Sequence, residues 1–177
     1  MQELILKESG VPFVRPTLVF GKEDILVNNI AWLIRKSPVF LIFESENYRI
    51  QPVYVGDLAE IAICQSTIDS GTTMDATRPE TFTFREFVEF IVQKVGSKTV
   101  FIKTPSSVGI FCGKILGLFL RDVLLTYDEL KGLMDKMLTS TQVPKMTRIS
   151  DWLAENKAMV GSTYSSEIVR RFRWSPT

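Results

Sequence analysis

The chain has 177 residues, of which 45% are hydrophobic and 23% charged, a composition typical of a globular protein with a sizeable core. Its 21 basic and 20 acidic residues leave a net charge of +1, so the charge balance does not favour nucleic acid as a partner. The sequence contains no histidine, which excludes Ser-His and Cys-His nucleophiles and removes the commonest metal ligand. We therefore expect no metal site and no nucleic-acid partner.

The two cysteines, Cys64 and Cys112, are too few for a four-ligand zinc site or a disulfide framework. Each lies in an apolar run, where burial raises the pKa of a thiol, so we expect both to be buried and unreactive. The N-terminal sequence MQELILKESG is charged and lacks the apolar stretch of a signal peptide. These features favour an intracellular, cytoplasmic protein, either free or peripheral to a membrane.

Strand and helix patterns alternate along the chain. After a helix end at 1–9, the patterns predict extended segments at 13–20, 39–43, 48–55, 73–76 and 100–102. They predict helices at 24–36, 58–67, 84–95, 107–120 and 126–137, and a last helix that begins at Ser150. This alternation favours an α/β fold with a mostly parallel sheet.

Local capping signals support several of these helices. Asp57 is placed to cap the helix at 58–67. Thr83 and Glu86 have the spacing of a capping box, and Gly96 is placed to end the helix that they begin.

The sequence contains no Gly-x-Gly, so it lacks both the dinucleotide fingerprint and a P-loop. Tyr127 and Lys131 have the Tyr-x-x-x-Lys spacing used for proton transfer in some oxidoreductases. However, Tyr127 falls in the first turn of a helix whose start Thr126 and Glu129 explain as a second capping box, and no cofactor-binding strand precedes it. We interpret the pair as structural and assign no catalytic residue.

The segment 108–120 is very apolar and carries glycines at every fourth position, at 109, 113 and 117. On a helix these glycines share one face, where another helix or a flat ligand can approach closely. The segment is too short to span a bilayer. Two interpretations stay open: a helix buried between two layers, or an exposed surface for dimerisation or for contact with a membrane or a hydrophobic subunit.

Taken together and in order, five segments resemble the C-terminal portion of the NAD(P)-binding epimerase/dehydratase-like proteins, which are extended and atypical short-chain dehydrogenase/reductases. Within that family, the sequence is most similar to the group of the epimerase-like accessory subunit of respiratory complex I. The segments are SGVPFVRPTLVFG (9–21), RIQPVYVGDLAEIA (49–62), RPETFTFREFVEFI (78–91), LLTYDELKGLM (124–134) and SDWLAENKAMVGSTYSSEIVRR (150–171).

The resemblance implies the C-terminal part of a Rossmann-type parallel sheet plus a small α/β substrate lobe, without the N-terminal nucleotide-binding half. It implies that 1–37 ends the sheet and that 38–177 forms the lobe, with the strand at 73–76 returning to the main sheet. The family's glycine-rich loop and Tyr-x-x-x-Lys lie upstream of the segment that matches Ser9. We therefore expect NAD or NADP in the complete protein and no cofactor on this chain alone.

The resemblance also implies roles for particular residues. The residues that would border the nicotinamide are Pro16, Thr17 and Leu18. The residues that would line or organise the substrate side are Gln51, Val53 and Tyr54, with Asn28 and Asn29 as weaker candidates. Ile50 and Gln51 occupy the positions of an arginine-aspartate pair found in sugar-nucleotide epimerases, which argues against a sugar nucleotide as substrate.

Three functions are compatible with this resemblance. The first is the substrate-binding portion of an NAD(P)-dependent epimerase-like or reductase-like protein, inactive in isolation. The second is a non-catalytic structural, assembly or membrane-side subunit, and the third is a sensor that binds the dinucleotide without turnover. The expected partners are the missing N-terminal half, another copy of the chain, or a hydrophobic surface that contacts 108–120.

Overall fold

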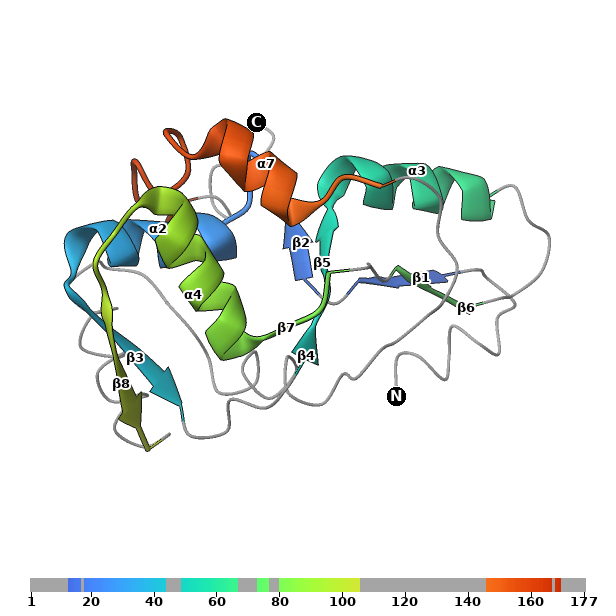
Figure 1. The fold of residues 1–177 in the computed structure, drawn as a ribbon. Helices are drawn as coiled ribbons and strands as arrows, with labels where there is room; N and C mark the ends of the chain where they lie inside the picture. The colour runs from blue at the N-terminus through green and yellow to red at the C-terminus, as the bar shows by residue number, and fades with distance from the viewer. Residues whose placement is uncertain are drawn as a thin grey trace.

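The computed structural model describes residues 13–16, 18–43, 49–66, 73–76, 80–105, 146–166 and 168–169. In chain order the elements are β1 (Phe13–Pro16), β2 (Leu18–Phe20), α2 (Leu26–Lys36), β3 (Val39–Phe43), β4 (Arg49–Ile50), β5 (Pro52–Tyr54), α3 (Val55–Ser66), β6 (Thr73–Ala76), β7 (Phe82–Thr83), α4 (Phe84–Val95), β8 (Val100–Thr104) and α7 (Ile149–Asn156). The predicted alternation of strands and helices is confirmed for these residues (Figure 1). The predicted helices at 1–9, 107–120 and 126–137 lie outside them.

The strands form pairs, most of them parallel. β1 pairs with β6, β2 with β5 and β3 with β8 in parallel, whereas β4 and β7 are antiparallel. The extended segment expected at 13–20 is confirmed at 13–16 and 18–20, where it pairs first with β6 and then with β5.

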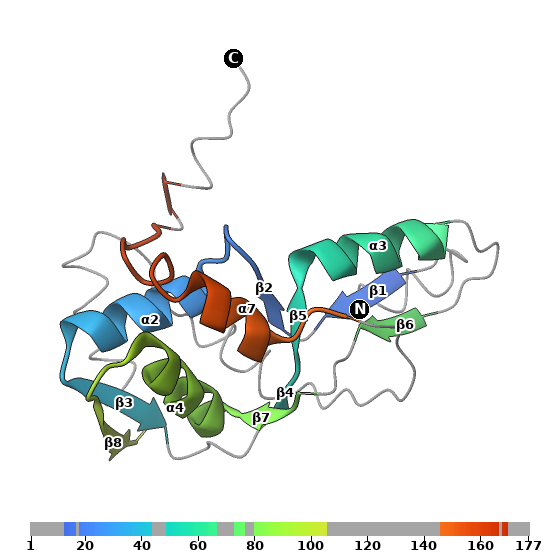
Figure 2. The ribbon, with the colours of Figure 1, turned by 45° about the horizontal axis from the view of Figure 1, so that its top comes forward.

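The β2–β5 pair lies in the middle of the described structure (Figures 1 and 2). The β1–β6 pair lies on one side of it and is covered by α3. On the other side α2, α4 and α7 pack together, and the β3–β8 pair lies beyond α2 and α4.

The hydrophobic core lies between α2, α4, α7 and the strands beside them. The apolar residues of α2 and α4 recur at helical spacing, so that each helix buries one face. The buried core residues of these two helices are Val27, Ile30, Ala31, Ile34, Phe87, Val88 and Ile91. Apart from the small Ala31, each of these side chains contributes about 1.5–3 kcal/mol through removal of its surface from water.

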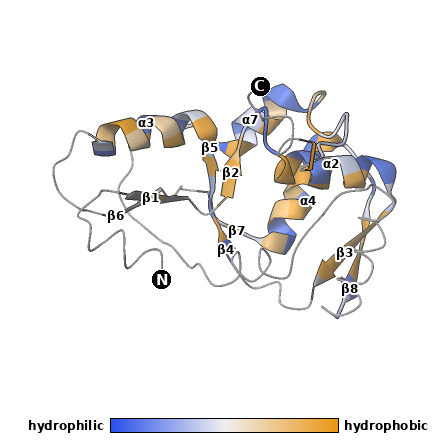
Figure 3. Cartoon of the chain, turned by 180° about the vertical axis from the view of Figure 1, so that it is seen from behind, coloured by the Kyte–Doolittle hydropathy of each residue, from blue (hydrophilic) through white to orange (hydrophobic). Residues whose placement is uncertain are grey.

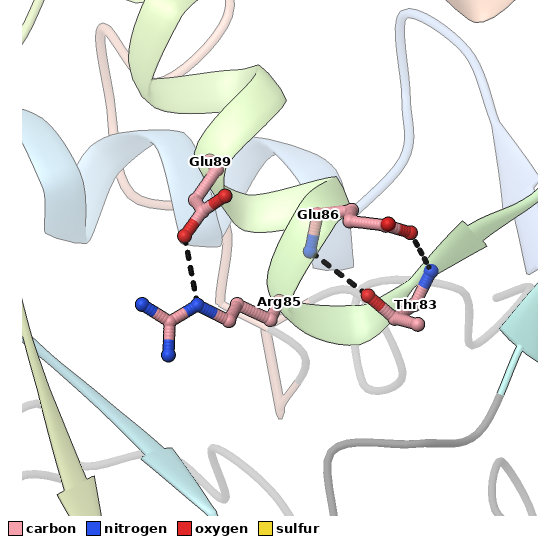
Figure 4. Close-up of polar contacts among 4 residues, drawn as sticks. All are labelled: Thr83, Arg85, Glu86 and Glu89. Carbon is pink, nitrogen blue, oxygen red and sulfur yellow. Dashed lines mark hydrogen bonds and ion pairs between the residues drawn. The ribbon is translucent and has the colours of Figure 1, made fainter.

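The capping box of α4 is present as predicted (Figure 4). The backbone N–H of Glu86 donates to Thr83 Oγ1 at 3.2 Å, and the backbone N–H of Thr83 donates to Glu86 Oε2 at 2.7 Å. Gly96 ends the helix in the left-handed conformation, with φ of 70°. These local signals fix both ends of α4.

Two expectations for α3 were wrong. The helix begins at Val55 rather than at residue 58, so Asp57 lies inside the first turn instead of at the cap. The carboxylate of Asp57 accepts hydrogen bonds from the backbone N–H of Thr147 at 2.8 Å and from its hydroxyl at 3.3 Å. Cys64 is exposed, because it lies on the outer side of α3 while the neighbouring Gln65 is buried.

Gly161, in the turn after α7, packs against the backbone of α2. It has a φ of 72°, and a Cβ at this position would lie 2.6 Å from the carbonyl carbon of Ala31 and from the nitrogen of Trp32. Backbone atoms cannot move aside as a flexible side chain can. The close contact therefore requires glycine.

We predict that Gly161→Ala lowers the free energy of unfolding by about 2–5 kcal/mol, because a left-handed alanine costs about 1–2 kcal/mol and overpacking adds about 1–3 kcal/mol. The matched control is Gly96→Ala, since Gly96 has a φ of 70° but no atom within 4 Å of its added Cβ. The control should lose only about 1–2 kcal/mol. Urea denaturation measures both variants, and equal losses would contradict the contact with α2.

We predict that Glu86→Gln flattens the dependence of stability on pH. The backbone N–H of Thr83 is the main cause that holds the pKa of Glu86 below its ordinary value of 4.5, and the Thr83 hydroxyl and Arg49 act in the same direction. A pKa lowered by folding gives stability that is present at neutral pH and is lost as the pH falls through the ordinary value of 4.5 and below it. The exposed Glu60 provides the control variant Glu60→Gln, which should keep the wild-type slope in thermal denaturation across this range.

Candidate functional site

The carboxyl ends of β2 and β5 meet at one edge of their sheet. Leu18 pairs with Pro52 and Phe20 with Tyr54, and the chain leaves β5 directly into α3 at Val55. Ligand sites of α/β proteins lie at the carboxyl ends of parallel strands. We refer to this place, made by the ends of the two strands, as the β2–β5 edge.

Three aromatic rings pack at the β2–β5 edge. Phe20 is completely buried, and its ring lies 5.7 Å from that of Tyr54 and 5.6 Å from that of Trp152 in α7. Trp152 is also buried, whereas Tyr54 is only partly buried. Of the three side chains, Tyr54 therefore offers the most surface to a ligand.

Two carboxylates hold the chain that enters α7. Asp57 accepts from Thr147, as described above, and Glu80 accepts from the backbone N–H of Ser150 at 3.4 Å. Glu80 also forms an ion pair with Arg148 at 3.2 Å. In each of these contacts the two residues are separated by between 68 and 90 positions in the sequence. No local sequence pattern indicates such contacts, so the sequence prediction missed them.

The cofactor-bordering candidates lie at the junction of β1 and β2. Pro16 ends β1 opposite Ala76, and Leu18 is a buried residue at the start of β2. Thr17 lies outside the described residues. Their role in cofactor binding stays a prediction.

The substrate-side candidates are divided between the two ends of β5. Gln51 is buried just before β5, and its Nε2 donates to Thr81 Oγ1 at 2.9 Å. Val53 is completely buried, and Tyr54 lies at the β2–β5 edge. The structure thus brings Tyr54 to the edge and leaves the substrate roles of all three residues as predictions.

The other two candidates lie on α2, and their side-chain amides bind the segment after α7. Asn28 Oδ1 accepts from the backbone N–H of Gly161, and Asn28 Nδ2 donates to the carbonyl oxygen of Thr163, both at 2.9 Å. Asn29 exchanges two hydrogen bonds of 2.9 Å with the backbone of Ser165. A role in substrate binding stays a prediction for both asparagines.

In the part of the chain that the structure describes, no helix combines the length and the apolar composition that a membrane span needs. The cysteine and carboxylate side chains of the same residues form no cluster that could hold a metal ion.

No protein-family model matches the chain. The chain is 31% identical over 81 residues to the mitochondrial NADH dehydrogenase (ubiquinone) 1 alpha subcomplex subunit 9 of Dictyostelium discoideum. This match covers 45% of the chain and 22% of that subunit, so the chain spans about a fifth of the length of this curated relative.

The fold is similar to that of a nucleoside-diphosphate-sugar epimerase from Staphylococcus aureus, with a TM-score of 0.55 and 17% identity over 86% of the chain and 55% of the epimerase. A dTDP-4-dehydrorhamnose reductase from Bacillus anthracis, solved in complex with NADP, matches with a TM-score of 0.46 and 16% identity over 55% of the chain and 34% of the reductase. The resemblance drawn from the sequence is therefore confirmed: the chain is similar in sequence to a subunit of NADH dehydrogenase and in fold to a sugar-nucleotide epimerase.

Proposed function

We propose that the chain is the C-terminal, substrate-binding portion of an NAD(P)-dependent epimerase/dehydratase-like or reductase-like protein. The observation that carries this proposal is the β2–β5 edge, where the partly buried Tyr54 lies between the buried Phe20 and the first turn of α3. The carboxyl edge of a parallel pair is where α/β proteins bind ligands. The sequence similarity to the Dictyostelium discoideum subunit and the epimerase fold support the same function.

In this proposal the nicotinamide cofactor supplies hydride transfer when it is bound, and the chain orients the substrate. The phenol of Tyr54 can donate or accept a hydrogen bond at the β2–β5 edge, while its ring packs against Phe20, which in turn packs against Trp152. The backbone from Pro16 to Leu18 would border the nicotinamide. The sequence lacks Gly-x-Gly, so we infer that the phosphates of the cofactor are bound by the N-terminal half and that this chain alone has no measurable affinity.

We predict that isothermal titration of the 177-residue chain with NADH or NADPH gives no binding, whereas the protein extended upstream through its own gene binds one of them with micromolar affinity. In the extended protein Tyr54→Phe serves as a matched control. It keeps the ring against Phe20 and removes only the hydroxyl, so it should leave cofactor affinity unchanged. Micromolar binding by the 177-residue chain itself, or none by the extended protein, would overturn the proposal.

A second candidate function is a non-catalytic assembly subunit with the same fold. It is favoured by the sequence similarity to a subunit of the NADH dehydrogenase 1 alpha subcomplex. The helix α3 includes hydrophobic residues (Figure 3), and two of them, Val55 and Ile63, are 49% and 66% exposed, which agrees with an interaction surface. The segment 108–120, the surface expected to contact a membrane or a hydrophobic subunit, lies outside the described residues.

We predict that, if assembly is the function, the product of the whole gene migrates with NADH dehydrogenase on native gels of the source cells. The readout is the enzyme's in-gel activity together with an antibody against this chain. Loss of this migration in high salt but not in mild detergent would indicate a polar contact instead of an apolar one. Migration of all the protein as a separate species would exclude the assembly function.

A further inference from the structure

The segment 161–165, which we call the strap, lies along the first turns of α2. Asn29 binds it at a single residue: Nδ2 donates to the carbonyl oxygen of Ser165, and Oδ1 accepts from its backbone N–H, each at 2.9 Å. Asn28 binds it at its other end through Gly161, and Asn28 Nδ2 also donates to Ser165 Oγ at 2.9 Å. The donors and the acceptor of both amides are therefore occupied by the chain itself.

Only the first end of the strap, at Gly161, is buried. Val160 and Gly161 are buried against α2, and Arg35 Nε donates to the carbonyl oxygen of Val160 at 3.2 Å. Beyond Gly161, residues 162–163 are exposed and 164–165 are only partly buried. This outer part is bound by the side-chain amides of the two asparagines, by a hydrogen bond of 3.1 Å from the backbone N–H of Ser162 to the carbonyl oxygen of Met159, and by an aromatic contact.

That aromatic contact joins the rings of Tyr164 and Trp32, whose centroids are 5.2 Å apart. This contact and the hydrogen bonds from the asparagines each contribute only a modest net stabilisation. The loss of backbone freedom in each ordered residue of the outer strap opposes them. Closure of the outer strap is therefore only weakly favoured.

We propose that the strap is a gate that opens about Gly161 as a unit, without unfolding of α2 or α7. In the closed state the strap occupies the amides of Asn28 and Asn29, so a ligand can reach these amides only in the open state. A role of this gate in substrate access rests on the proposed function, in which the two asparagines lie on the substrate side. The gate itself follows from the contacts and burial of the strap.

The test is amide hydrogen exchange of the 177-residue chain, followed residue by residue by NMR. We expect the amide of Ser165 to exchange at least 100-fold faster than that of Ile34, which is buried in α2, and its rate to stay constant in low concentrations of urea. Asn29→Ala should speed exchange at Ser165 by about 10- to 100-fold, which corresponds to the loss of the two hydrogen bonds between Asn29 and the backbone of Ser165.

The matched control is Asn156→Ala, because Asn156 Nδ2 also donates to a backbone carbonyl, that of Trp152 in α7, at 2.9 Å. This variant should leave exchange at Ser165 unchanged. The proposal is overturned if Ser165 and Ile34 exchange at one rate with the same urea dependence, or if both variants speed exchange at Ser165 equally. Neither readout involves cofactor, so failure of the gate can be distinguished from failure of the proposed function.

Discussion

Burial of Phe20 is the constraint on which the arrangement of the candidate site depends. Its ring is completely buried and contacts Tyr54 from the neighbouring strand and Trp152 from α7. Burial of a phenylalanine contributes about 1.5–3 kcal/mol, and each aromatic pair adds about 0.5–1.5 kcal/mol. Because Phe20 and Tyr54 are the last residues of their strands, this packing also fixes where the chain turns toward α2 and α3.

Polar contacts hold the start of α7 in place, so that Trp152 can pack against Phe20. The two acceptors are Asp57 in the first turn of α3 and Glu80, whose side chain is only 13% exposed. A hydrogen bond to a charged group at such a place is worth about 1.5–3 kcal/mol. The exposed pair of Arg85 and Glu89 on α4 contributes only about 0.3–0.5 kcal/mol, so it has little effect on the arrangement of the site.

The sequence was most informative where the determining contacts are local. The helix from Leu26 to Lys36 follows from the spacing of its apolar residues, and α4 follows from the pair Thr83 and Glu86 together with Gly96. Each of these signals spans one to three helical turns. The alternation of such elements also predicted the parallel pairing, because parallel strands need a crossover connection.

The site was less predictable, since its contacts join distant parts of the chain. Tyr54 was placed on the substrate side only by family resemblance, and no local pattern indicated that Trp152 would pack against Phe20. The position of Asp57 illustrates the same difficulty. An aspartate before an apolar run is typical of a helix cap, but here the helix begins earlier and the carboxylate binds a residue 90 positions away.

The C-terminal part of the described structure connects the β2–β5 edge to the asparagines of α2. Trp152 packs at the edge, and the chain continues from α7 through Val160 to Gly161, which lies against the backbone of α2. Arg35 and Asn28 of α2 bind this part of the chain directly, at the carbonyl oxygen of Val160 and the backbone N–H of Gly161. The buried turn at Gly161 therefore ties the chain that leaves α7 to α2, since a close-packed backbone contact leaves no room for gradual adjustment.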